Sequence, residues 1–259
     1  MSTIYTLNGK VLKNSANDKW LTKKAVDPYN PLGLPAGVMR MKMPDGWTIG
    51  GYDTASLEFT QVSSSPNIWD MKVKSGSGIT YWAMPSAGII ELMGFNPEGV
   101  TGYGSGIKNI MFKTTTKIGA MRLAEITSIG QLSSNIVEVG PLSLPNVTNI
   151  ASAFYQKAYL TYVELNDLGN LENCQGTFSQ CQSLTSMPIL NGLVKVNNVQ
   201  GMFAYSRNIE TGILDMYNTL NALGTVTEHS GAFGDCGADT VTGAAELAQI
   251  PSSWGGTGA

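Results

Sequence analysis

NVTNIASAF (residues 146–154) is followed by three variants of itself: NLENCQGTF (170–178), KVNNVQGMF (195–203) and TVTEHSGAF (225–233). Each ends in a phenylalanine, and the steps between the phenylalanines are 24, 25 and 30 residues. An aliphatic residue stands seven positions before each phenylalanine, and another apolar slot lies four positions before it. A repeat of this length is typical of a solenoid, whose coils bury together a face that one coil cannot bury alone. We therefore expect the four phenylalanines to stack in one buried column.

The run after each phenylalanine carries spaced apolar residues and predicts one short strand per coil, with these strands stacked in parallel. The strands are expected at Ile136/Val139, Leu160/Val163/Leu165 and Leu184/Met187/Ile189. Residues 121–139 form a degenerate copy in which Gly130 replaces the phenylalanine. Residues 88–102 and 107–118 are expected to form two irregular first coils, with Phe112 in the column of Ile136.

The N-terminal part shows a β pattern without the repeat. Residues 4–7 and 11–12 predict two strands around an Asn-Gly turn at residues 8–9. Met39, Met41 and Met43 alternate with basic residues, which is typical of a half-buried strand. Residues 56–62 and 68–73 continue the β pattern, whereas the prolines at 28, 31 and 35 predict a linker. We predict a small β module over residues 1–77.

The C-terminal part predicts helices. Apolar residues at helical spacing indicate a helix from Ile213 to about Gly224, and residues 242–250 indicate a second one. Helices at the end of a solenoid cover the open face of its last coil. The predicted fold is therefore mainly β: the N-terminal module, then a parallel-strand solenoid over residues 78–259, with a helical cap at about 211–259.

The repeats resemble a known family. AFYQKAYLTYVEL (153–165), TFSQCQSLTSMPIL (177–190) and MFAYSRNIETG (202–212) are similar to the MF-x-x-C-x-S-L-T-S-x-P repeats of BspA-like leucine-rich-repeat proteins. VSSSPNIWDMKV (62–73) and the tail from His229 to Gly256 resemble a subgroup found in gut Bacteroidales, their phages and their mobile elements. Only Cys181 and Cys236 keep the cysteine of the family pattern.

The resemblance implies either a bacterial surface adhesin or a phage virion protein, since such coils occur in both. We predict a non-enzymatic structural protein of a phage particle, as a tail, fibre or capsid-decorating component that presents the repeats for binding a host glycan or protein. The alternatives are a bacterial cell-surface adhesin or interaction module and, less favoured, a carbohydrate-active enzyme. The N-terminus is polar and charged, so we expect no secretion signal, which an adhesin would need. The sequence also contains no apolar run long enough for a membrane span. Together these features favour a virion protein made in the host cytoplasm.

Charge is unevenly distributed. The chain carries a net charge of −3, but residues 1–45 hold seven basic and three acidic residues, giving +4 there and −7 in the remainder. This composition gives no case for nucleic-acid binding. The N-terminal charge is either a solvated face or an arm that attaches to other virion proteins or to further copies of the chain. The residues proposed for attachment are Lys10, Lys13, Lys19, Lys23 and Lys24.

Residues able to carry chemistry are few. The single histidine, His229, falls in an aliphatic slot and is expected to be partly buried and hydrogen-bonded rather than catalytic. The three cysteines are too scattered for a disulfide framework or a zinc site, and Cys174 is expected to be a small buried residue. We predict no cofactor, no metal and no catalytic residue. Two alternatives stay open: carboxylate pairs (Glu164 with Asp167, Glu91 with Glu98) suited to glycoside hydrolysis, and a calcium site at Asp235 and Asp239.

The remaining candidates lie on the surface. Tyrosines and small polar residues occupy the variable positions around each phenylalanine, and such residues are common in recognition surfaces because tyrosine gives contact area at low entropic cost. The predicted ligand-binding residues are Tyr155, Tyr159, Tyr162 and Tyr205. The alternative is that these tyrosines pack between the coils.

Overall fold

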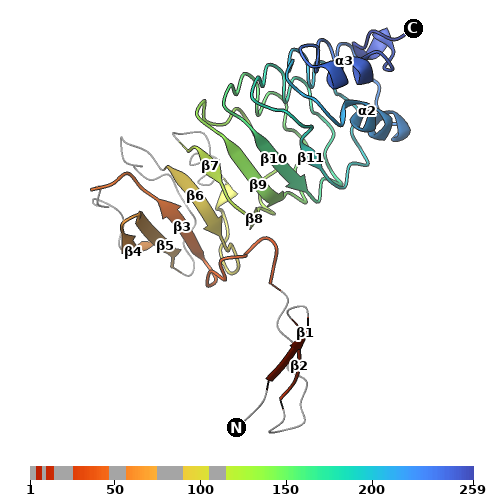
Figure 1. Cartoon of the computed structure of the whole chain (residues 1–259). Helices are drawn as coiled ribbons and strands as arrows, with labels where there is room; N and C mark the ends of the chain where they lie inside the picture. Colours follow the sequence, from red (N-terminus) through yellow and green to blue (C-terminus); the bar gives the residue numbers. More distant parts are fainter. Residues whose placement is uncertain (1–3, 8–9, 15–25, 47–56, 75–89, 105–114) are drawn as a thin grey trace.

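The structure is a computed structural model that describes residues 4–7, 10–14, 26–46, 57–74, 90–104 and 115–259. It is mainly β and contains a β-solenoid of about four turns (Figure 1). Phe112 and most of the irregular coil predicted at residues 107–118 lie outside the described residues. Within them, the helices are α2 (Ile213–Ala222), α3 (Val241–Leu247) and a 3-10 turn at Ser252–Trp254.

The predicted phenylalanine column is confirmed. Phe154, Phe178, Phe203 and Phe233 are fully buried, and their rings stack at centroid distances of 5.0, 5.5 and 5.5 Å. Each coil donates backbone hydrogen bonds to the next, as from Phe154 N to Thr177 O at 3.0 Å and from Phe178 N to Met202 O at 2.7 Å. The equivalent residues of successive coils therefore lie one above another over the whole repeat.

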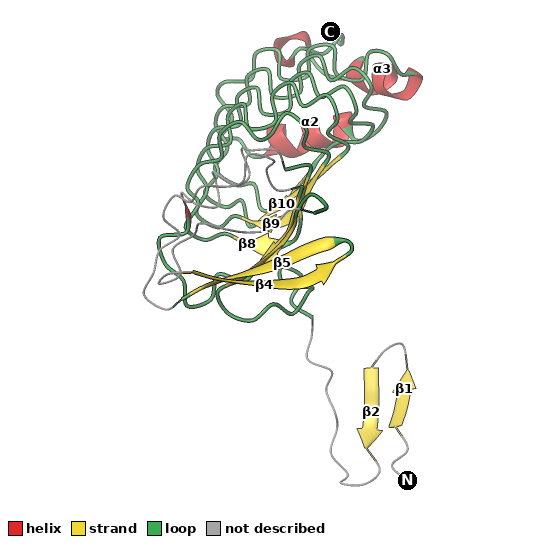
Figure 2. Ribbon diagram, turned by 90° about the vertical axis from the view of Figure 1, so that its left-hand side faces the viewer, coloured by secondary structure: helices red, strands yellow, loops and turns green. Residues whose placement is uncertain are grey.

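One wall of the solenoid is part of a nine-stranded sheet, and irregular backbone closes the other side (Figure 2). The sheet runs in the order β11-β10-β9-β7-β6-β3-β5-β4, with β8 pairing β6 and β9. From β6 to β11 the strands are parallel. Its strands are β3 (Val38–Lys42), β4 (Leu57–Ser64), β5 (Asn67–Val73), β6 (Glu91–Phe95), β7 (Lys117–Ile118), β8 (Met121–Arg122), β9 (Glu138–Ser143), β10 (Tyr162–Asn166) and β11 (Ile189–Leu190).

The antiparallel strands β3, β4 and β5 extend this sheet. β3 pairs with β6 on one side and with β5 on the other, and β5 pairs with β4. Met39, Met41 and Met43 of this region are buried, as their alternation predicts, and they belong to the same apolar core as the phenylalanine column. The boundary predicted near residue 77 lies outside the described residues, and the strands on its two sides share one sheet and one core.

β7 and β8 are two halves of one strand position, separated by Gly119 and Ala120. A Cβ atom on Gly119 would lie 2.1 Å from the backbone oxygen of Met93 in β6, so only glycine fits there. Leu92 aligns with Ile118 and Phe95 with Met121, which keeps both halves in register with β6. The close backbone approach lets the coil continue without a break in the core.

The proline-containing segment at residues 26–37 packs on the sheet. Leu34 is buried, its backbone N–H donates to Asn30 Oδ1 at 2.7 Å, and its carbonyl accepts from Asn96 Nδ2 at 2.9 Å. Nearby, the Arg122 guanidinium lies 4.9 Å from the centroid of the Tyr29 ring. This segment is therefore anchored to the body of the protein from about residue 29 onward.

The N-terminal strands β1 (Ile4–Leu7) and β2 (Lys10–Asn14) form a separate antiparallel hairpin. It is a two-stranded sheet of its own and lies apart from the solenoid in Figure 1. Two strands lie where the sequence predicts them, and the predicted turn at residues 8–9 lies outside the described residues.

Helices α2 and α3 lie at the C-terminal end, where the sequence predicts helices. Ile213 and Leu220 are the buried residues of α2. The final segment continues the stack, because Trp254 O accepts a hydrogen bond from Phe233 N at 2.9 Å and the Trp254 ring stacks on His229 at 4.4 Å. Among the described helices, none combines the length and the apolar character needed to cross a bilayer.

Candidate binding surface

Tyr155 and Tyr205 lie on the irregular wall, beside the phenylalanine column. Gln180 links their positions, because its side-chain amide donates to Tyr155 Oη at 3.5 Å and its backbone N–H donates to Ala204 O at 2.9 Å. Tyr205 is 53% exposed, whereas Tyr155 is half-buried. The structure thus brings these two predicted residues close to a glutamine that was not predicted.

The residues two positions after each phenylalanine adopt a left-handed backbone conformation. Gln156, Gln180, Tyr205 and Asp235 have φ angles of 58°, 62°, 61° and 55°. Side chains with a Cβ disfavour this region, where glycine is unrestricted. The residues are nevertheless all non-glycine, and their side chains reach the surface to different degrees.

Amide side chains form two hydrogen-bonded pairs along the stack. Gln156 Nε2 donates to Gln180 Oε1 at 3.1 Å, and Gln175 Nε2 donates to Gln200 Oε1 at 3.3 Å. The members of the Gln156–Gln180 pair lie two positions after the phenylalanine of their repeat. The members of the Gln175–Gln200 pair lie three positions before it. The sequence held a signal for both, since glutamine recurs at each of these positions in two adjacent repeats.

Tyr162 belongs to a different wall. It begins β10 on the sheet, is 40% exposed, and donates from its hydroxyl to Glu164 Oε2 at 2.5 Å. This hydrogen bond raises the pKa of Tyr162 to about 12. Tyr159 is 61% exposed in the turn that leads from the irregular wall to the sheet. The four predicted tyrosines are therefore spread over two walls and the turn between them.

Charged side chains alternate across the exposed face of the sheet. The strand register places Lys42, Glu91, Lys117 and Glu138 next to one another in that order. Lys42 Nζ lies 3.0 Å from Glu91 Oε1. Lys117 forms an ion pair with Glu138, and the hydrogen bond in this pair raises the pKa of the Lys117 amine. Each charge on this row faces an opposite one, so the row stabilises the strand order and leaves little net potential.

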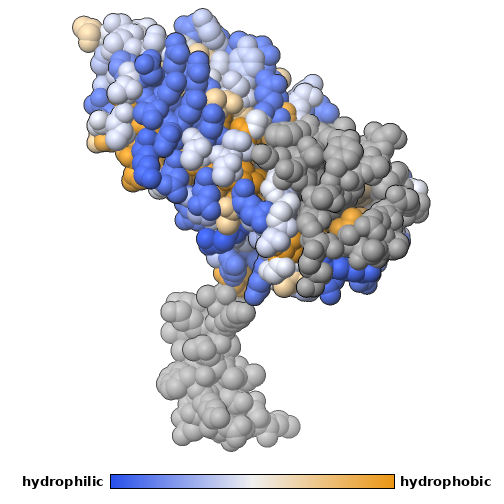
Figure 3. Space-filling view, turned by 180° about the vertical axis from the view of Figure 1, so that it is seen from behind, coloured by the Kyte–Doolittle hydropathy of each residue, from blue (hydrophilic) through white to orange (hydrophobic). Residues whose placement is uncertain are grey.

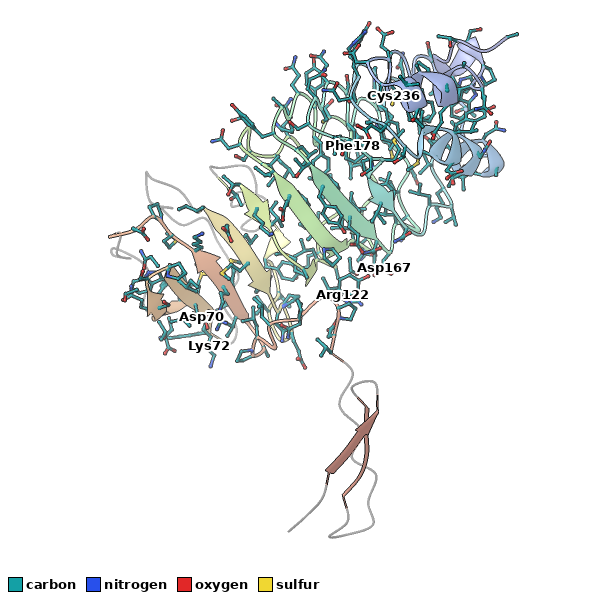
Figure 4. All side chains as sticks on the ribbon, viewed as in Figure 1. Asp70, Lys72, Arg122, Asp167, Phe178 and Cys236 are labelled. Carbon is teal, nitrogen blue, oxygen red and sulfur yellow. The ribbon has the colours of Figure 1, made fainter. Side chains whose placement is uncertain are left out.

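Two further ion pairs lie near this row. Arg40 bonds both oxygens of Asp70, at 2.7 and 2.8 Å. Arg122 Nη1 lies 3.6 Å from Asp167 Oδ2, which also accepts a hydrogen bond from Ser143 (Figure 4). The Arg40–Asp70 pair joins the neighbouring strands β3 and β5. The Arg122–Asp167 pair instead reaches from β8 across β9 to the residue that follows β10.

Three of the four carboxylates considered for glycoside hydrolysis have side-chain partners, and the fourth, Glu98, lines the cavity described below. Glu164 accepts from Tyr162 and from Asn166, Asp167 pairs with Arg122, and Glu91 pairs with Lys42. The partners of Glu164 lie on its own strand, β10, whereas the ion pair of Glu91 with Lys42 joins β6 to β3.

The predicted calcium ligands Asp235 and Asp239 both contact Arg207. The ion-pair distances are 3.2 Å to Asp235 and 2.8 Å to Asp239, and the hydrogen bond from Arg207 lowers the pKa of the Asp239 carboxyl. Across the parts of the chain that the structure describes, no group of three or more His, Cys, Asp or Glu side chains could hold a metal ion. The Arg207 guanidinium therefore holds both carboxylates in ion pairs.

A cavity of about 490 Å³ lies where the anchored segment meets the first coils. Its lining includes Asp27, Tyr29, Glu98 and Glu125. Both Glu125 oxygens accept backbone hydrogen bonds, from Gly102 N at 2.8 Å and Gly104 N at 3.2 Å, and Asp27 accepts from Tyr29 N at 2.9 Å. These carboxylates hold the cavity walls in place.

His229 is partly buried and hydrogen-bonded, and Cys174 is buried, as predicted. His229 is half-buried, and its Nδ1 lies 3.1 Å from Ser253 O. The three cysteines are free and buried, and burial raises the pKa of the Cys174 thiol to about 12. Lys157 occupies the slot of Cys181 and is only 6% exposed, so burial lowers the pKa of its amine.

Of the basic residues proposed for attachment, Lys10 and Lys13 lie on β2 of the hairpin. Lys19, Lys23 and Lys24 lie outside the described residues. Their role stays a prediction.

No family model, no curated protein and no solved structure matches this chain.

Proposed function

We propose that this chain is a non-enzymatic structural protein of a phage particle, built into a tail, a fibre or the capsid surface. The N-terminal hairpin attaches the protein to other virion components, and the solenoid presents a binding surface to the host. The resemblance of the repeats to BspA-like leucine-rich-repeat proteins supports the virion setting. Residues 211–259 serve as the helical cap of the solenoid in this proposal.

The observation that carries the attachment role is the separation of the hairpin from the sheet. β1 and β2 pair with each other, and within the described residues they add no strand to the nine-stranded sheet. An isolated two-stranded hairpin is at best marginally stable in water, because it has no apolar face packed against a third element. An assembly partner, or a further copy of the chain, would supply this third element. Because the hairpin carries Lys10 and Lys13, a partner with an acidic surface suits it.

The solenoid suits display. Among the described residues, buried side chains from Met39 to Trp254 belong to one apolar core, which supports the surface residues. Figure 3 shows hydrophilic side chains in rows across the coils. Repeated coils of this kind offer extended binding surfaces.

Mass spectrometry and immunogold labelling of purified particles test this proposal. We expect the protein in particles at a fixed copy number. Its absence from particles together with labelling of the bacterial envelope would refute the virion role and support a cell-surface adhesin.

A deletion of residues 1–25 tests the attachment role and keeps Tyr29 and Leu34, which anchor the following segment to the sheet. We expect the truncated protein to keep its circular dichroism spectrum and unfolding midpoint and to be lost from particles. The matched variant Lys10→Ala/Lys13→Ala keeps the hairpin and removes two charges, so weaker incorporation of this variant would assign part of the attachment to charge. Normal incorporation of the deletion variant would show that the hairpin does not attach the protein.

A further inference from the structure

We propose that the side chains of Tyr155, Gln156, Gln180 and Tyr205, with Gln175 and Gln200 beside them, form a track that binds a neutral, linear glycan lying along the solenoid axis. This inference deepens the proposed display function and rests on it for the choice of surface. The sequence predicts ligand binding by four tyrosines, whereas the track consists of two of them and four glutamines.

The direction of the track follows from the stacking. The phenylalanine rings of successive coils are separated by 5.0 and 5.5 Å, and this stacking places the equivalent surface residues of successive coils in a line. Gln156 and Gln180 touch through their amides, and Tyr205 occupies the same position in the next coil. A ligand that lies along this line meets a similar group at every step, which suits a polymer of repeating units.

The chemistry of the track is uncharged and polar. Residues 151–156, 175–180 and 200–205 include no Asp, Glu, Lys or Arg. Each glutamine amide can both donate and accept hydrogen bonds, as can a tyrosine hydroxyl, and a sugar hydroxyl does the same. The exposed ring of Tyr205 adds an apolar face for the C–H surface of a sugar ring. An acidic polymer would find no cation among these residues.

The backbone conformation gives an independent reason to assign a role to these side chains. Two positions before the phenylalanine, where φ is also positive, three of the four repeats use glycine: Gly176, Gly201 and Gly231. Two positions after it, all four repeats keep a larger side chain in the same disfavoured region. Unfavourable backbone conformations that persist often mark residues kept for function.

The opposite wall is a poorer candidate for the same ligand. Lys42, Glu91, Lys117 and Glu138 alternate there, and their charges are paired with one another. A neutral glycan would have to displace these pairs to reach the strands, whereas the amides of the track are at the surface.

The test uses glycine variants, which remove side chains of the track and also relieve the strain of the left-handed backbone conformation. Tyr205→Gly and Gln180→Gly delete a side chain where φ is 61° and 62°. Ser152→Gly is the matched control, because Ser152 has a φ of 58° in the column where later repeats use glycine. All three variants should unfold at a midpoint close to that of the unchanged protein, so a change in binding is not a change in folding.

Binding is measured by calorimetry and on an array with cello-, xylo-, manno- and maltohexaose, their disaccharides, and a hexamer of galacturonic acid as the acidic probe. We expect at least one neutral hexasaccharide to bind more tightly than its disaccharide. Tyr205→Gly and Gln180→Gly should weaken that binding about tenfold, as expected when a side chain that contributes strongly to an interface is removed. Ser152→Gly should bind like the unchanged protein.

Three results would overturn the track: no binding of any neutral hexasaccharide, tighter binding of the acidic hexamer, or equal affinity in all the variants. Particle incorporation of the same variants is measured separately. Glycan binding by a protein that is absent from particles would leave the track standing and refute the virion role. Normal incorporation into particles without glycan binding would refute the track and leave the virion role standing.

Discussion

Replacing Phe178 with alanine should destabilise the solenoid more than the same change at Phe154. Both rings are fully buried, but Phe178 stacks between Phe154 and Phe203, whereas Phe154 begins the column. Truncating a buried phenylalanine costs about 3–5 kcal/mol, and each aromatic pair adds roughly 0.5–1.5 kcal/mol beyond area burial. We therefore expect Phe178→Ala to cost about 1 kcal/mol more than Phe154→Ala.

A double-mutant cycle isolates the stacking energy. In Phe178→Ala/Phe203→Ala the second substitution removes a ring that has already lost one partner. The double variant should therefore be about 1 kcal/mol more stable than the sum of the single effects predicts. The pair Phe154 and Phe233 lies at the two ends of the column and should be additive within about 0.5 kcal/mol.

Urea unfolding followed by far-ultraviolet circular dichroism gives these free energies from midpoint and slope. Phe178→Leu serves as a control that keeps apolar volume and loses the ring. Equal costs at the middle and the start of the column, together with additivity of the adjacent pair, would refute the idea that ring stacking couples the coils.

Other predictions concern buried thiols, a close backbone contact and an ion pair. Burial raises the pKa of all three thiols, that of Cys174 to about 12, so none should react with iodoacetamide at pH 8 until the protein is unfolded. Because the folded pKa lies above the unfolded one, the stability from protonated thiols is complete below about pH 8.5 and is lost as the pH rises toward the folded pKa, which a series of melting curves would show. Gly119→Ala should cost more than about 3 kcal/mol in urea unfolding, since its Cβ would lie 2.1 Å from a backbone oxygen, whereas Gly234→Ala should change stability by less than about 0.5 kcal/mol. Arg40→Ala should cost about 1 kcal/mol, and a stability no lower than that of the unchanged protein would show that its two hydrogen bonds to Asp70 contribute nothing.

The repeat in the sequence was enough to predict the centre of the fold. A residue at a fixed position in each coil meets the same neighbours above and below, so a recurring phenylalanine can only form a column when the coils stack. For the same reason Cys174, in an aliphatic slot, is buried. Local patterns also predicted the alternation of Met39, Met41 and Met43 and the start of α2 at Ile213.

The position of the tyrosines could not be predicted in this way. Tyr155 and Tyr162 are seven residues apart in the sequence, but a turn between them places one on the irregular wall and the other on the sheet. The glutamines that pair with Gln180 and with Gln175 recur at fixed positions in the sequence. Their hydrogen bonds, however, depend on the left-handed backbone and on the spacing between the coils.

The sequence by itself determined the period, the buried column and the local strands and helices, because these depend on residues within one coil and on its copies. The tertiary structure alone decided that β3, β4 and β5 extend the solenoid sheet, with β3 pairing β6 across about fifty residues of chain. It also decided that Gly119 lies against β6 and that the charges on Lys42, Glu91 and Lys117 alternate across strands. Strand pairing and register are set by contacts between segments far apart in sequence, and no local pattern contains them.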